Sequence, residues 1–266
     1  MESYEDKEFV ESNLEDADII GIDTEFDWRS TYFPTLCLLQ IAIKNKIFLI
    51  DCLRFKDLRF LKKILEDKRK LIIFHSSRSD TTVLYTNLGI KIKNVFDIQI
   101  AEKKINGGEI MNYGAIVNNY FPVKLNKSET NSNWLKRPFT QNQLAYAAND
   151  VNFLIEVFKK QMKILKKKNL YKETYLDSQI ESSFGNQDLY ISRLKKLKKP
   201  SKLEKKIFLW REQQAKKKNI PPSRIFRNKD LKFLTKAINN DNTDVKLISE
   251  IIKDSNSTQD FFKEVL

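Results

Sequence analysis

The chain has 266 residues, 41% of them hydrophobic, and a formal net charge of +13. This apolar content is enough for a folded core and argues against global disorder. The single histidine excludes His-rich zinc sites. None of the six glycines falls in a G-x-x-x-x-G-K or G-x-G-x-x-G pattern, which disfavours nucleotide binding by a glycine-rich loop.

Targeting and redox features are sparse. No stretch approaches the roughly 18 apolar residues that a membrane-spanning helix requires. The acidic start, residues 1–6, does not look like a signal peptide. We therefore expect a soluble, cytoplasmic protein. Cys37 and Cys52 lie in or beside apolar strand-like runs, and we expect reduced core residues, with a disulfide left open.

The positive charge is concentrated in the second half of the chain. Residues 1–150 hold 21 Lys and Arg against 21 Asp and Glu, whereas residues 151–266 hold 27 against 14. This asymmetry favours a polyanionic partner, most simply a nucleic acid, for the second half. The alternative is an ordinary lysine-rich solvated surface, which explains many lysines but not their segregation.

Apolar periodicity predicts the elements of the first half. In chain order they are a short strand over 18–23, a hairpin of strands 36–43 and 47–51, a helix over 58–65, a strand over 71–74, a helix over 79–88 ending at Gly89, a strand near Val95, and helices over 97–105 and 109–120. This order predicts an α/β fold in which helices flank a mixed sheet.

The second half reads as mostly helical. After a loop over 122–138, Thr140 and Gln143 form a capping-box pattern that opens one long helix to about Lys166. A lysine-rich, poorly periodic connection follows, and helical patterns resume at 203–218 and 230–238, separated by Pro221-Pro222. We expect a domain boundary near residues 199–200.

Two of the three acidic motifs stand at element boundaries. Asp23 and Glu25 are two residues apart at a strand end, so both point to one face. Asp80 lies at the start of a helix, where Ser77-x-x-Asp80 also fits a capping box. Asp97, which has no paired acid, is interpreted as a helix cap or a buried hydrogen-bond acceptor.

Tyr146 and Asp150 are four residues apart on the polar flank of the long helix and therefore share a face. Each motif alone has an ordinary structural explanation, such as an acidic strand end or a solvated pair. The order and placement of the three motifs nevertheless allow folding to bring their side chains together into one cluster. Carboxylate oxygens are the ligands that hard divalent cations prefer, so the cluster indicates metal-dependent phosphate chemistry.

The same residues resemble a known family. Asp23-Thr-Glu-Phe26, Phe74-His-Ser-Ser-Arg-Ser-Asp80 and Tyr146-Ala-Ala-Asn-Asp150 are similar to the three motifs of the DEDDy 3′–5′ exonucleases, most closely the ribonuclease D family. Two further stretches, at 125–128 and 133–138, support the resemblance to the ribonuclease D family. The sequences at 210–212 and 219–221 resemble the start of an HRDC (helicase and RNase D C-terminal) domain.

The resemblance implies an RNase H-like exonuclease domain over 1–170, a basic helical connector over 171–199 and an all-α HRDC-like domain that binds nucleic acid over 200–266. It also implies two divalent ions, Mg2+ or Mn2+. Asp23 would bridge both ions, Glu25 and Asp150 would complete one site, and Asp80 would hold the second ion. Tyr146 would orient the attacking water.

The implied activity is hydrolysis of RNA from its 3′ end with release of 5′-mononucleotides, with trimming of tRNA precursors as the expected role. The alternatives are a 3′–5′ exonuclease acting on DNA and a non-catalytic RNA-binding scaffold. Thr24, Phe26, Trp134 and Arg137 are candidate substrate contacts, although Trp134 could instead anchor its loop. No membrane association is expected, and no protein partner can be inferred.

Overall fold

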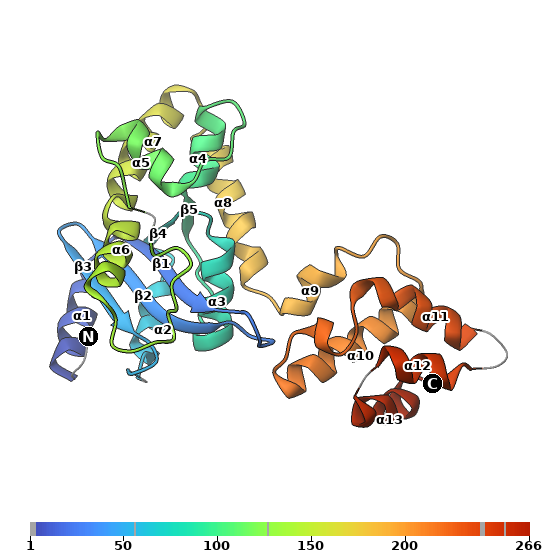
Figure 1. Ribbon diagram of the computed structural model, residues 1–266. Coiled ribbons are helices and arrows are strands. Elements are labelled where there is room, and N and C mark those ends of the chain that lie inside the picture. The colour runs from blue at the N-terminus through green and yellow to red at the C-terminus, as the bar shows by residue number, and fades with distance from the viewer. Residues whose placement is uncertain (1–3, 56, 127, 240–242, 253) are drawn as a thin grey trace. The chain divides into compact units, whose positions relative to one another are not determined.

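The computed structural model describes residues 4–55, 57–126, 128–239, 243–252 and 254–266. Residues 1–3 of the acidic start and Lys127 of the stretch at 125–128 lie outside the described residues. None of the described helices is long and apolar enough to cross a membrane. The chain divides into two units, one of residues 1–27 and 35–187, the other of residues 28–34 and 188–266 (Figure 1).

A five-stranded sheet forms the centre of the first unit. Its strands are β1 (Ile19–Asp27), β2 (Thr35–Ile43), β3 (Lys46–Asp51), β4 (Leu71–Phe74) and β5 (Val95–Asp97), in the order β3-β2-β1-β4-β5. β2 is antiparallel to β1 and β3, whereas β4 is parallel to β1 and β5. The predicted mixed sheet and hairpin are confirmed.

Helices cover both faces of this sheet, and alternating side chains of each strand show how. Ile72 and Phe74 of β4 pack into one apolar cluster, while Ile73 between them packs into another. The helices of the first cluster are α1 (Tyr4–Glu15), α2 (Arg59–Leu65) and α3 (Arg78–Leu88). Those of the second are α4 (Ile98–Ile105), α5 (Tyr113–Tyr120) and α7 (Leu154–Lys167).

The predicted long helix after Thr140 is interrupted. The capping box of Thr140 and Gln143 is present and opens α6 (Gln141–Asn152). α6 ends at Phe153, whose N–H donates to the hydroxyl of Tyr113 at 3.1 Å before α7 begins. The prediction of one continuous helix to Lys166 is therefore wrong, because a contact from α5 competes for a backbone donor.

The stretch expected to connect two domains contains a helix of the first unit. α8 (Tyr171–Gly185) packs against α3, α4 and β5, whereas α9 (Leu189–Leu194) belongs to the second unit. Residues 171–199 are therefore divided between the units. The buried face of α8 is made of small residues, namely Thr174, Ser178, Ser182 and Gly185. Such a face has no apolar periodicity, so the sequence pattern does not reveal the helix.

The second unit is helical and includes a short segment from early in the chain. Its further elements are α10 (Lys202–Lys218), 3-10 turns at Pro222–Arg224 and Asn228–Asp230, α11 (Leu231–Asn239), α12 (Val245–Ile251) and α13 (Ser255–Glu264). Tyr32 lies in its core, where the Tyr32 hydroxyl donates to Glu212 Oε2 at 3.2 Å and the Tyr32 N–H donates to Asn219 Oδ1 at 3.1 Å.

Candidate active site

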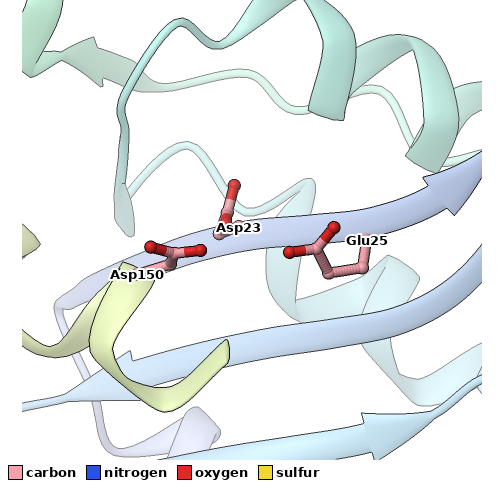
Figure 2. Close-up of side chains that lie close together, drawn as sticks. All are labelled: Asp23, Glu25 and Asp150. Carbon is pink, nitrogen blue, oxygen red and sulfur yellow. The ribbon is translucent and has the colours of Figure 1, made fainter. Parts of the chain in front are cut away.

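Three carboxylates from two elements meet beside the sheet. Asp23 and Glu25 extend from β1, and Asp150 extends from α6. Figure 2 shows the three side chains facing one another. Each of them offers an oxygen that lies within 4.8 Å of the others. The expected alternation along β1 and the spacing on α6 thus place these acids together.

Asp80 approaches the same strand from α3. Its Oδ1 accepts a hydrogen bond from Thr24 Oγ1 at 2.6 Å, and its carboxylate also accepts the Thr24 backbone N–H. β4 pairs with β1 only through Ile19–Gly21, so this N–H is left for a side chain. The capping box proposed for Ser77 and Asp80 is absent, because the Ser77 side chain makes no capping hydrogen bond.

The pKa values of all four acids are raised. Burial raises the pKa of Asp23 well above its usual range, and the charges of Asp80, Asp150 and Glu25 add to the shift. Burial likewise raises the pKa of Glu25 to about 9, that of Asp80 to about 7 and that of Asp150 to about 6. A divalent cation would remove this repulsion, so the carboxylate oxygens fit such an ion.

Tyr146 is half-buried beside Asp150. Its hydroxyl is hydrogen-bonded to the Asp150 carboxylate and lies 3.5 Å from Thr130 Oγ1. Burial raises the pKa of the Tyr146 phenol above its usual value. The hydroxyl therefore keeps its proton at neutral pH and can donate a hydrogen bond.

A cavity of about 360 Å³ opens beside these groups. Its lining residues are Asp23, His75, Asn112, Tyr113, Gly114, Leu125, Asn126, Thr130, Tyr146 and Asp150. Seven of them were not predicted as site residues. His75 is the hydrogen-bonded residue expected at a strand end, since its Nε2 lies 3.2 Å from the carbonyl of Met111. Of the others, only Leu125 and Asn126 fall in a stretch that the sequence resemblance had marked.

The candidate substrate contacts are engaged within the protein, and their contact with substrate stays a prediction. Thr24 binds Asp80, and Phe26 packs against the apolar cluster of α1–α3. Arg137 forms a bidentate pair with Asp51, with N–O distances of 2.6 and 2.8 Å, and also donates to the carbonyl of Trp134 at 2.6 Å. The hydrogen-bonding groups of Thr24 and Arg137 are thus occupied by protein acceptors.

Trp134 is packed as a residue that anchors its loop would be, which was one of the two alternatives expected for it. Only 4% of its surface is exposed, and its ring lies 6.2 Å from that of Tyr146 and 5.8 Å from that of Phe139. The Arg137 guanidinium stacks over the Phe139 ring at 3.8 Å. The loop before α6 is therefore held to β3 by the Arg137–Asp51 pair, and its Trp134 ring packs against the Tyr146 ring.

The chain is similar in sequence to known ribonucleases D. Ribonuclease D of Desulfotalea psychrophila is 32% identical over 242 residues, which cover 86% of this chain and 64% of the relative. The chain thus spans less than two thirds of that relative's length.

Solved structures share the fold. The exoribonuclease RNase D of Escherichia coli, described as involved in structured RNA processing, superimposes with a TM-score of 0.83 at 21% identity over 100% of this chain and 72% of that one. Brucella melitensis NrnC with bound Mg2+ has a TM-score of 0.59 at 22% identity over 70% and 92% of the two chains.

The match that decides the family covers most of the first unit. A model of the 3′–5′ exonuclease family matches residues 2–166, a range that includes all four acids and Tyr146. The chain belongs to the 3′–5′ exonuclease family.

Proposed function

We propose that this chain is a metal-dependent 3′–5′ exoribonuclease that removes 5′-mononucleotides from the 3′ end of RNA. The observation that carries the proposal is the convergence of the Asp23, Glu25 and Asp150 carboxylates within 4.8 Å of one another, next to Tyr146. Membership of the exonuclease family supports the reaction, and the likeness to ribonuclease D supports RNA as the substrate.

The donor set suits two divalent ions, Mg2+ or Mn2+. Asp23, Glu25 and Asp150 would hold one ion, and Asp80 together with Asp23 would hold the second. When bound, the ions supply positive charge to the phosphodiester and lower the pKa of water. A cluster of four buried acids is otherwise self-repelling, which supports this assignment of the residues.

The protein groups around the acids would place the reactants. Tyr146 keeps its proton, so it would orient the attacking water as a hydrogen-bond donor rather than remove a proton from it. Asp150 accepts from the Tyr146 hydroxyl and would fix its direction. The adjoining cavity of about 360 Å³ would receive the 3′ end of the RNA.

We further propose that the second unit is the HRDC-like part and holds the RNA backbone. Residues 28–34 and 188–266 contain 21 Lys and Arg against 10 Asp and Glu, a net charge of +11. Backbone phosphates favour such a surface without regard to base sequence. A structured RNA with a short single-stranded 3′ end, such as a tRNA precursor, would use both units.

Digestion of a 5′-labelled tRNA with a 3′ extension tests the proposal. In Mg2+ or Mn2+ we expect a ladder that shortens from the 3′ end, and in EDTA no cleavage. Asp23→Asn should abolish cleavage. Asp18→Asn, which alters an exposed acid immediately before the same strand, should not.

The same digestion is repeated with two other substrates, DNA of matched sequence and RNA with a blocked 3′ end. Equal degradation of the DNA would overturn the choice of RNA, and cleavage of blocked RNA would overturn the direction. Full activity of Asp23→Asn would show that the acidic cluster is not the active site.

A further inference from the structure

Asp97 is a buried acid outside the cluster, and its surroundings suggest a specific task. It closes β5 and caps α4, and its side chain is 0% exposed. β5 lies next to β4 with Phe74 and Asp97 paired in register, so the two strands end side by side. The Asp97 side chain is thereby brought beside the turn that leads from β4 into α3.

The Asp97 carboxylate accepts three backbone N–H groups from two separate segments. Oδ1 accepts from Gln99 at 2.9 Å, which caps α4, and from Ser76 at 3.0 Å. Oδ2 accepts from Ser77 at 2.7 Å. One side chain therefore ties the start of α4 to the turn that precedes α3.

This turn has an unfavourable backbone conformation. Ser76 has φ of 64°, in the left-handed region that residues with a side chain rarely adopt. α3 begins two residues later at Arg78, and Asp80 lies in its first turn. The direction of Asp80 therefore depends on a strained turn that local sequence does not favour.

Asp80 in turn meets β1 at a single point. Its carboxylate accepts from the hydroxyl and the backbone N–H of Thr24, the residue between Asp23 and Glu25. A small rotation of the first turn of α3 would break these contacts and move Asp80 away from the other acids. The turn also carries His75, which lines the cavity.

We propose that Asp97 is a positioning residue for the metal site: its carboxylate holds the Ser76–Ser77 turn and so keeps Asp80 against β1. This inference rests on the proposed function, because it assigns Asp97 a role in metal binding by Asp80. In this role Asp97 acts through Asp80 and is not itself a ligand.

Asp97→Asn is the direct test, because it preserves the size of the side chain. Its carbonyl oxygen can still accept from Ser76 and Gln99, but its amide N–H would face the Ser77 N–H. We expect the Mg2+ concentration that gives half of the Mg2+-induced rise in Tm to increase by about 10- to 100-fold, as for other groups that support metal ligands. The Mg2+ concentration for half-maximal RNA cleavage should shift in parallel.

Glu102→Gln is the matched control. Glu102 is a second buried carboxylate on α4, 1% exposed, and its Oε2 accepts from the Tyr120 hydroxyl at 2.8 Å and from Gln161 at 2.7 Å. Glu102→Gln should lower the Tm of the metal-free protein but leave the Mg2+ midpoint unchanged. This comparison separates a general loss of stability from a displaced ligand.

Ser76→Gly supplies a rescue. Glycine adopts a positive φ without steric cost, so this substitution should stabilise the turn independently of Asp97. In the Asp97→Asn background it should bring the Mg2+ midpoint back toward the wild-type value. On its own it should leave the midpoint unchanged.

The outcomes distinguish the inference from the proposed function. If wild-type protein neither responds to Mg2+ nor cleaves RNA, the proposed function fails. If the wild type does both and Asp97→Asn shifts the midpoint no more than Glu102→Gln, the role of Asp97 alone is overturned. Failure of both Asp97→Asn and its Ser76→Gly rescue to fold, while Glu102→Gln folds, would also overturn it, because Asp97 would then support the whole unit.

Discussion

Asp23 lies in the middle of the acidic cluster and experiences the charge of every other member. Burial and the neighbouring carboxylates Asp80, Asp150 and Glu25 all raise its pKa. A buried residue that destabilises the metal-free protein is typical of a site selected for binding rather than for stability.

Asp23→Asn should therefore separate stability from metal binding. Without metal we expect a more stable protein, because the amide removes a group whose ionisation is opposed by burial and by the neighbouring carboxylates. With Mg2+ the variant should gain little or no stability. Chemical denaturation in EDTA and in Mg2+ measures both effects, and a metal-free variant less stable than the wild type would contradict the repulsion.

The raised pKa values also make the stability of the metal-free protein depend on pH. Unfolded carboxyls titrate near pH 4, whereas burial raises the folded pKa to about 6 for Asp150, 7 for Asp80 and 9 for Glu25. The folded metal-free state thus holds more protons, so its stability should fall as the pH rises from about 4 to about 9. Because Mg2+ replaces those protons, the rise in Tm that it causes should grow with pH over the same window.

Thermal unfolding in EDTA and in Mg2+ at several pH values between 5 and 9 checks this prediction. Asp23→Asn serves as the control, since its pH slope in EDTA should be shallower. A Mg2+-induced rise in Tm that does not depend on pH would be inconsistent with the proton competition described above.

Trp134 offers a prediction about Tyr146. Its buried ring packs against the Tyr146 ring, so Trp134→Phe would leave a gap at that point. We expect kcat to fall by as much as about 100-fold through misplacement of the hydroxyl, with KM for RNA nearly unchanged. In a Tyr146→Phe background the same substitution should have little further effect, and equal losses in both backgrounds would exclude this coupling.

Among the elements, those that carry the acids were predictable and the one that braces them was not. β1, the hairpin, α3 and α6 have clear apolar patterns and end signals, including Gly89 in a left-handed conformation and the Thr140 cap. The sequence also placed Asp23, Glu25 and Asp150 on compatible faces. It could not identify the partners of Thr24 and Arg137, because Asp80 and Asp51 are brought to them only by the tertiary fold.

α8 was expected only as part of a basic helical connector, and its packing on the first unit was missed for a different physical reason. Its buried face consists of small residues, which allow close approach to α3 instead of filling space with apolar volume. At Gly185 a Cβ atom would lie 2.0 Å from Thr81 Oγ1 and 2.7 Å from the carbonyl oxygen of Arg78. The helix thus packs directly on the first turn of α3, next to Asp80.

Gly185→Ala should force α8 and α3 apart. We expect a loss of roughly 1–3 kcal/mol in the free energy of unfolding, the usual cost of overpacking, and a higher Mg2+ requirement for cleavage. Ser183→Ala, two residues earlier on the exposed side of α8, is the control and should be neutral. Denaturant unfolding of the two variants decides the matter; equal stabilities would mean that the helices do not approach this closely at Gly185.

At the scale of the whole molecule, charge and chemistry are assigned to different units. The first unit contains all four acids and Tyr146, whereas the second has a net charge of +11 out of the total +13. The second unit cannot simply be cut away to test this division. Its core includes Tyr32 from the 28–34 segment, so a chain ending at residue 187 would lose the partners Glu212 and Asn219.

Charge substitutions that leave the core intact are therefore the better test. Lys202, Lys205 and Lys217 are exposed on α10, and their replacement by Gln should weaken RNA binding. The slope of log K against log salt concentration should become shallower by about 2, because each phosphate contact contributes roughly 0.7–0.9. The kcat at saturating RNA should not change, since the acids of the first unit are untouched.

Replacing Lys44, Lys68 and Lys93 by Gln provides the comparison, because these are exposed lysines of the first unit. If this second triple variant leaves the salt slope unchanged while the α10 variant lowers it, RNA phosphates contact the second unit. Equal changes in both variants would mean that RNA responds to the net charge of the protein rather than to a defined surface. That result would remove the second unit's proposed role while leaving the assignment of the acids intact.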